Sequence, residues 1–291
     1  MIEEIAPAKI NLYLHVGPLR ADGLHDLQSF FFFADDGDRL RVLPSSDLSL
    51  TINGPFADSL AGEPVESNLV FKAAVLLRET FSITDGAQMV LDKRLPVAAG
   101  IGGGSADAAA ALRALVELWS INISEEALQG LAFQLGADVP ACLSRSPVNV
   151  SGAGEVLSPG GSLPPLWVVL VNSRQLLSTG PVFNAFDTDN GASSLLGAPP
   201  QSDHSNIDDL KSVFESTRND LEPFAIKLQP SIAHVLEFLA SCEGVIASRM
   251  SGSGATCFAL FSDGVLAQNC ANEAQERAWW ALSTKIATTK L

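Results

Sequence analysis

Hydrophobic and polar residues alternate along the start of the chain. Over residues 9–16 every second position is apolar, the period of a half-buried β-strand, and we predict a strand over 2–17. Four consecutive phenylalanines at 30–33 predict a strand buried on both faces, and the acidic, glycine-containing stretch 35–38 predicts a tight turn. The same patterns predict further strands at 39–44, 48–53, 88–91, 147–150, 166–171, 245–248 and 256–261.

Other segments repeat their apolar residues at helical spacing. Leu69, Ala73, Leu76 and Leu77 recur on one face and predict a helix over 68–80. Ser124, followed by two acidic residues, predicts the start of another helix, which the stretch 135–140 interrupts. The remaining predicted helices cover about 106–119, 207–216, 219–228, 230–241 and 264–277.

Glycine and proline divide the chain into two parts. They are dense at 151–165, so we place a boundary there and expect one domain over 1–157 and a second over 158–291. The Gly-, Ser- and Pro-rich stretch 188–205 is expected to be an exposed loop. A chain of 291 residues is long enough for two domains of ordinary size.

The glycine-rich segment 95–106 is the strongest single feature. It leads from a proline-marked turn into an alanine-rich helix that Ser105 or Asp107 is expected to cap. Glycines let the backbone approach a ligand closely, and the N–H groups at a helix N-terminus, with the helix dipole, favour an anion. The segment therefore predicts a phosphate site; a flexible loop before a buried helix is the alternative.

Two common nucleotide-binding patterns do not fit this segment. The Walker pattern requires Gly-Lys-Ser/Thr, and the chain contains no Gly-Lys pair. A dinucleotide-binding fingerprint beginning at Gly100 would need a glycine where Ser105 stands.

Charge and composition narrow the range of partners. The net charge of −15 argues against nucleic acid, which needs a basic surface. No apolar run approaches the ~20 residues of a membrane helix, and the acidic first residues do not resemble a signal peptide. The four cysteines are widely spaced, so we expect reduced thiols, no metal site and a cytoplasmic protein.

Five segments taken together resemble a known enzyme family. Residues 7–12, 20–25, 95–109, 135–140 and 251–258 are similar, in order and spacing, to the motifs of the GHMP small-molecule kinases. They are most similar to the branch that phosphorylates 4-diphosphocytidyl-2-C-methyl-D-erythritol in the non-mevalonate route to isoprenoid precursors. The resemblance covers nearly the whole chain and is weakest over residues 186–216. It implies an α+β fold of two domains, an N-terminal one like ribosomal protein S5 domain 2 and a C-terminal ferredoxin-like one.

The resemblance also implies a reaction and its residues. The γ-phosphoryl group of ATP would pass to the 2-hydroxyl of the acceptor, with Lys9 and Asp138 as catalytic residues and Mg²⁺ held mostly by ATP and water. Asp138 would accept the hydroxyl proton, although an aspartate before Val139-Pro140 is also a favoured helix cap. The implied ATP-binding residues are Pro96, Val97, Ala98, Ala99, Gly100, Ile101, Gly102, Gly103, Gly104, Ser105 and Ala106, with Asn68, Leu69 and Lys93 as candidates near the nucleobase.

The acceptor side departs from the family pattern at one position. The family has Gly-Tyr-His where this chain has Gly23-Leu24-His25, so His25 is retained but one aromatic ring for stacking on cytosine is lost. That loss would weaken cytidine binding by roughly 1 kcal/mol. The implied substrate-binding residues are Asn11, His25, Phe183, Gly252, Ser253 and Gly254.

The sequence is compatible with three functions. The first is the kinase just described, acting as a monomer or homodimer. The second is a GHMP kinase for another alcohol, which Leu24 would favour. The third is a phosphate-binding module without turnover, and the presence of both Lys9 and Asp138 argues against it.

Overall fold

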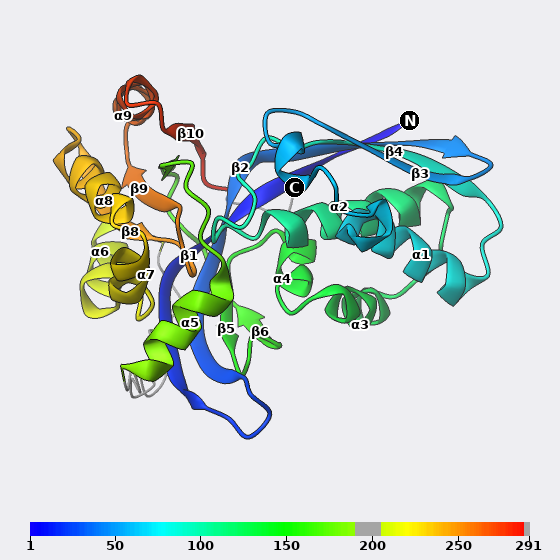
Figure 1. The fold of residues 1–291 in the computed structure, drawn as a ribbon, viewed down its shortest axis with the longest axis horizontal. Helices are drawn as coiled ribbons and strands as arrows, with labels where there is room; N and C mark the ends of the chain where they lie inside the picture. Colours follow the sequence, from blue (N-terminus) through cyan, green and yellow to red (C-terminus); the bar gives the residue numbers. More distant parts are fainter. Residues whose placement is uncertain (190–204, 288–291) are drawn as a thin grey trace. The chain divides into compact units, whose positions relative to one another are not determined.

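The computed structural model describes residues 1–189 and 205–287 (Figure 1). These residues form two compact units that interleave along the chain. Unit 1 comprises 1–8, 36–97 and 102–144, and unit 2 comprises 9–35, 98–101 and 145–291. Strands β1 (Ile2–Leu19) and β2 (His25–Ser45) contribute residues to both units. The expected boundary at 157/158 stays a prediction.

Unit 1 is built from a sheet with helices on one side. Within it, β4 (Gly86–Asp92) pairs antiparallel with the second half of β2 and parallel with β3 (Leu48–Asn53). Figure 1 shows the helices of this unit gathered on one side of β3 and β4. These helices are α1 (Leu69–Phe81), α2 (Gly103–Leu118), α3 (Glu125–Leu135) and α4 (Val139–Ser144), and two 3₁₀ turns, η1 (Ala57–Leu60) and η2 (Val65–Ser67), precede α1.

The core of unit 1 explains the position of α2. Its alanine run at 108–111 is fully buried, and α2 packs against α1. Small side chains allow two helices to approach closely, and apolar burial stabilises the pair. Arg113 anchors the middle of α2 through a hydrogen bond from Nε to Glu4 Oε2 of 3.0 Å.

Unit 2 contains a four-stranded antiparallel sheet in the order β10-β7-β9-β8. Its connections follow the ferredoxin-like pattern that the family resemblance implies, with helical crossovers after β7 and after β9. A separate pair, β5 (Val148–Ser151) and β6 (Val156–Pro159), extends from the first half of β2. The sheet strands are β7 (Trp167–Asn172), β8 (Val245–Met250), β9 (Cys257–Phe261) and β10 (Trp280–Lys285).

The helices of unit 2 bury one face of its sheet. Val169 and Val171 of β7 lie in one hydrophobic core with Ile232 and Val235 of α8 and Ala271 of α9. The helices are α5 (Thr179–Thr188), α6 (Ile207–Ser216), α7 (Glu222–Leu228), α8 (Ser231–Ser241) and α9 (Gly264–Glu276). Among the described residues, none of the helices is of a length and apolarity suited to crossing a membrane.

Most predicted elements are confirmed, one predicted turn is wrong and one helix was missed. The turn expected at 35–38 is wrong, because β2 continues through it and the buried carboxylate of Asp38 accepts hydrogen bonds from the backbone N–H groups of Arg94 and Leu95. Helix α5 was not predicted, because Gly180 and Pro181 in its first turn resemble a loop. The loop expected at 188–205 lies almost wholly outside the described residues.

Candidate active site

Lys9 is held on strand β1 by a chain of polar contacts. Its ammonium nitrogen donates to Asn11 Oδ1 at 2.9 Å and lies 4.0 Å from the centre of the Phe31 ring. The Asn11 amide nitrogen donates to Ser29 Oγ at 3.0 Å, so the Asn11 side chain has a defined orientation. Lys9 and Asn11 are both buried, at 4% and 3% exposure. The expectation that they share a strand face is confirmed, and the result is a fixed positive charge.

The middle of the glycine-rich segment lies against this strand within unit 2. The Lys9 backbone N–H donates to the carbonyl of Ile101 at 2.9 Å, and Ser251 Oγ donates to the carbonyl of Gly100 at 2.9 Å. The Asn11 backbone N–H in turn donates to Ser251 Oγ at 3.2 Å. Residues 98–101, strand β1 and the second glycine loop, 251–255, therefore form one hydrogen-bonded assembly.

Glycines are required where these two loops meet. A Cβ atom on Gly252 would lie 2.8 Å from the carbonyl oxygen of Gly100, and one on Gly100 would lie 2.8 Å from the backbone nitrogen of Gly254. Gly100 (φ 74°), Gly252 (φ 56°) and Gly254 (φ 85°) also have positive φ. Ser253 is buried, and its hydroxyl lies 2.9 Å from that of Thr179 on α5.

The end of the glycine-rich segment, in unit 1, opens helix α2. The helix begins at Gly103, with Gly102 (φ 61°) as its N-cap and no side-chain cap. The expectation that Ser105 or Asp107 caps the helix is therefore wrong, because the helix begins at Gly103 and both residues lie inside it. The first-turn N–H groups of a helix have no intrahelical acceptor, which makes this turn suitable for an anion.

A buried charged network, which the sequence patterns do not predict, lies beside this turn. Lys93 Nζ donates to Asp38 Oδ2 at 2.5 Å and to Asp107 Oδ2 at 2.6 Å, and all three side chains are almost fully buried. Burial opposes the charge on Lys93, but the two carboxylates outweigh it and raise the pKa of Lys93. Burial raises the pKa of Asp107 to about 7, with Lys93 opposing and Asp38 adding to the shift. An aspartate inside an alanine-rich helix was the one sequence signal for this network.

His25 and Phe183, two of the predicted substrate-binding residues, lie together in unit 2. Their ring centres are 5.4 Å apart, and the Phe186 ring contacts His25 edge-on at 5.8 Å. His25 Nδ1 is 2.8 Å from the carbonyl oxygen of Gly17, and Nε2 is 3.2 Å from Asp187 Oδ1. Leu24 is 54% exposed, so the residue that replaces the family tyrosine faces solvent.

Asp138 and the candidates for the nucleobase pocket lie in unit 1. Asp138 immediately precedes α4, is partly exposed, and accepts a hydrogen bond from the Cys142 N–H at its backbone carbonyl. Asn68 caps α1 by accepting from the N–H of Val70, and Leu69 is the first residue of that helix. The roles predicted for Asp138 and for the nucleobase pocket stay predictions.

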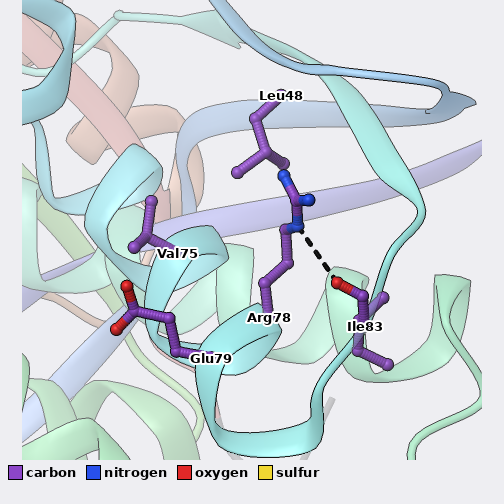
Figure 2. Close-up of a pocket in the computed structure, with 5 residues that line it drawn as sticks. All are labelled: Leu48, Val75, Arg78, Glu79 and Ile83. Carbon is purple, nitrogen blue, oxygen red and sulfur yellow. Dashed lines mark hydrogen bonds between the residues drawn. The ribbon is translucent and has the colours of Figure 1, made fainter.

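A pocket of about 280 Å³ lies elsewhere in unit 1 (Figure 2). Arg78 crosses it and donates from Nε to the carbonyl of Ile83 at 3.3 Å, so its guanidinium is already engaged. Leu48, Val75, Arg78, Glu79 and Ile83 line the pocket, and none of them is a predicted site residue.

Comparison with known proteins assigns the family. The model of the GHMP kinase N-terminal domain matches residues 68–146, and that of the GHMP kinase C-terminal domain matches 201–278. A 4-diphosphocytidyl-2-C-methyl-D-erythritol kinase from Paramagnetospirillum magneticum is 46% identical over 97% of each chain. The chain belongs to this branch of the GHMP kinase family. A kinase of the same name from Parvibaculum lavamentivorans is 45% identical over 96% of each chain.

Solved structures agree with this assignment. A crystal structure of 4-(cytidine 5'-diphospho)-2C-methyl-D-erythritol kinase covers 98% of this chain and 99% of its own, with 32% identity and a TM-score of 0.80. A homoserine kinase from Cytophaga hutchinsonii shares the fold at 18% identity, with a TM-score of 0.74. As a GHMP kinase, this chain is an ATP-dependent small-molecule kinase with the expected two-domain α+β fold.

Proposed function

We propose that this kinase transfers the γ-phosphoryl group of ATP to the 2-hydroxyl of 4-diphosphocytidyl-2-C-methyl-D-erythritol. The product is the 2-phosphate, an intermediate of the non-mevalonate route to isoprenoid precursors. Near-full-length relatives of that name support the substrate. The structural observation that carries the proposal is the buried Lys9 ammonium, oriented by Asn11 and Phe31 on a strand that also binds the glycine-rich segment.

The glycine-rich segment is the proposed site for the ATP phosphates. The N–H groups of the first turn of α2 and the helix dipole supply positive charge for them. The described residues contain no group of three or more His, Cys, Asp or Glu side chains that could hold a metal ion. We therefore propose that Mg²⁺ is bound as the MgATP substrate, held by phosphate oxygens and water, with the Ser105 hydroxyl as an additional ligand.

Lys9 and Asp138 are the proposed catalytic residues. In phosphoryl transfer, catalysis consists mainly of holding the two oxygens in line and neutralising the charge that develops between them. The Lys9 ammonium would stabilise that charge. The Asp138 carboxylate would orient the acceptor hydroxyl and accept its proton. A proton leaves the hydroxyl as the new O–P bond forms and the bond to ADP breaks.

His25, Phe183 and the second glycine loop are proposed to bind the acceptor. The face of the Phe183 ring would stack on the cytosine, beside the His25 ring. His25, whose Nε2 lies 3.2 Å from Asp187 Oδ1, would lie at the edge of the cytosine. Because the Asn11 amide already contacts Lys9 and Ser29, its contact with the acceptor would use the second N–H of the amide. Gly252, Ser253 and Gly254 complete the proposed set.

We further propose that the enzyme works in the cytoplasm, as a monomer or homodimer, without nucleic acid or membrane as a partner. The net charge of −15 supports the exclusion of nucleic acid. Size measurement in solution, at several protein concentrations, decides the oligomeric state.

An assay of ADP release tests the function. The purified protein is given MgATP with one of three acceptors: diphosphocytidyl-methylerythritol, mevalonate or homoserine. We expect ADP only with the first, and mass spectrometry should find one added phosphoryl group on it. ADP only with another alcohol would establish a different GHMP kinase, the alternative that Leu24 favours. ATP binding with no ADP from any acceptor would establish a phosphate-binding module.

A further inference from the structure

Residues 217–221, between helices α6 and α7, contact strand β1 within unit 2. The Leu14 N–H donates to the carbonyl of Arg218 at 3.0 Å, and the Asp220 N–H donates to the carbonyl of Leu14 at 2.8 Å. The two stretches therefore pair as parallel strands do. This short segment, far along the chain, holds the strand that carries the proposed catalytic lysine.

The Asn219 side chain connects this segment to the second glycine loop. Its Nδ2 donates to the backbone carbonyl oxygens of Met250, at 2.9 Å, and of Gly252, at 2.8 Å. Its Oδ1 accepts from the N–H of Leu221 at 3.0 Å, and Asn219 is buried. An amide nitrogen carries two hydrogens, so Asn219 uses both of them to hold the residues on either side of Ser251.

The second glycine loop contacts Asn11 at two places. Ser251 Oγ accepts from the Asn11 backbone N–H at 3.2 Å and donates to the carbonyl of Gly100 at 2.9 Å. A Cβ atom on Gly252 would lie 3.3 Å from Asn11 Oδ1, the oxygen that accepts from Lys9 Nζ at 2.9 Å. The backbone of Gly252 therefore packs against the side chain that orients Lys9. Because buried groups are close-packed, a displacement of this loop would displace Asn11.

We propose that Asn219 is a positioning residue for phosphoryl transfer. It holds the second glycine loop against β1, and through that loop it fixes Asn11 and the Lys9 ammonium. Phosphoryl transfer depends on such placement, since a displacement of about 1 Å that originates far from the reacting atoms can cost roughly 10²-fold in rate. The inference rests on the proposed roles of Lys9 and Asn11.

Asparagine is the residue type that this arrangement requires. Two carbonyl oxygens need two N–H donors from one planar group, while Oδ1 still accepts from Leu221. An ionised aspartate has the same shape and retains that acceptor, but it donates no hydrogen bond and would face two carbonyl oxygens. Asn219→Asp therefore separates the hydrogen bonds to the loop from the filling of space.

Steady-state kinetics of the full chain, measured below every Tm, test the inference. Asn219→Ala should lower kcat by roughly 10- to 100-fold, because the Lys9 ammonium loses its fixed position. Kd for MgATP, measured by calorimetry, should stay near the wild-type value, because the helix N-terminus proposed to bind the phosphates belongs to unit 1. An unchanged kcat, or a loss of ATP affinity equal to the loss of kcat, would overturn the inference.

A matched control separates positioning from general stability. Asn219→Ala should also lower Tm, because two buried carbonyl oxygens lose their donor. Asn206→Ala removes the side chain that caps α6 in the same unit, so it should lower Tm with kcat unchanged. If kcat falls equally in both variants, Asn219 has no role beyond stability and the inference is wrong.

The conservative variant tests the hydrogen bonds themselves. Asn219→Asp keeps the shape of the side chain and its contact with Leu221, yet it should lower kcat at least as much as Asn219→Ala. A wild-type kcat in Asn219→Asp would show that shape alone is needed and would contradict the inference.

A double-mutant cycle tests the route through the loop. Ser251→Ala removes the hydroxyl that joins Asn11 to Gly100, so it should lower kcat by itself. Adding Asn219→Ala to Ser251→Ala should then cost less than it does in the wild type, and independent, multiplicative losses would count against the inference. If the Asn219 variants do not fold, Ser251→Ala alone decides, and a wild-type kcat in that variant would overturn the inference.

The inference and the proposed function are decided by different measurements. The acceptor that releases ADP with wild type decides the function. The ratio of kcat in the variant to kcat in wild type, measured with that acceptor, decides the inference. Turnover of another alcohol by wild type, with the predicted loss in Asn219→Ala, would refute the proposed substrate and support the positioning role.

Discussion

The ammonium group of Lys9 donates a hydrogen bond to Asn11 Oδ1, two residues along the same strand, at 2.9 Å. The Phe31 ring, whose centre is 4.0 Å away, covers the same ammonium. A lysine side chain is long and flexible, and these two contacts fix its charge in place. Such preorganised charge is what a transition state with developing negative charge requires.

Replacing Lys9 should therefore reduce turnover more than substrate binding. Lys9→Met should lower kcat by roughly 10²-fold or more, with Kd for ATP little changed. Steady-state kinetics of ADP release and calorimetry measure the two quantities. Lys227→Met is a matched control, because that lysine lies 5.1 Å from the Phe224 ring but is exposed and outside the site. A kcat that survives Lys9→Met would remove Lys9 from the mechanism.

Asp138 should be needed for chemistry and not for folding. Asp138→Asn keeps the shape of the side chain but cannot accept the hydroxyl proton, so we expect kcat to fall by at least ~10²-fold. Tm and ATP affinity should stay at the wild-type values. Asp85→Asn, on an exposed aspartate of the same unit, should leave kcat unchanged. If Asp138→Asn instead lowers Tm and retains turnover, Asp138 is a structural residue.

Leu24→Tyr should restore an aromatic ring beside His25. Base–aromatic stacking contributes about 1–3 kcal/mol, so the variant should lower KM for the cytidine-containing acceptor by roughly five-fold. KM for ATP should not change, because Leu24 lies on the β1–β2 hairpin of unit 2. Leu19→Tyr, at a similarly exposed leucine of the same hairpin, is the control. Equal effects of both tyrosines would show that added hydrophobic surface, not stacking, is responsible.

His15 should make the protein less stable in acid. Its ring is fully buried, neither ring nitrogen has a hydrogen-bond partner among the described residues, and Nδ1 is 3.7 Å from Asp220 Oδ2. Burial lowers the pKa of His15; Asp220 opposes the shift, and Arg218 and Arg249 add to it. The unfolded chain therefore binds the proton more readily, and the free energy of unfolding falls as pH drops below about 6.5.

Urea denaturation at pH 5 to 8 measures this loss. His15→Gln should reduce the fall between pH 7 and 5, whereas His234→Gln, at an exposed histidine of the same unit, should leave it unchanged. Identical pH dependence in wild type and His15→Gln would mean that His15 does not titrate on unfolding.

The residues of the site differ in how much of their setting was predictable. The strand containing Lys9 and Asn11 followed from strict alternation, and the face that they share followed from its period. Asn68 caps α1 and Ser124 caps α3, and both caps are local interactions. The cap by Ser124 was predicted from the acidic residues that follow it. The start of α2 at Gly103 was not predicted, because glycines in a sequence favour a loop. Here the surrounding tertiary packing imposes a helix on them.

By itself, the sequence determined the period of its strands and helices, the two glycine loops and the family motifs, since each depends on residues close together in the chain. Only the tertiary structure decided which distant residues are partners. Lys93 meets Asp38 and Asp107 because strand, loop and helix pack together in unit 1, and Ser251 meets Asn11 across 240 positions in unit 2. Burial then sets the charge of Asp107, which no pattern of neighbouring residues encodes.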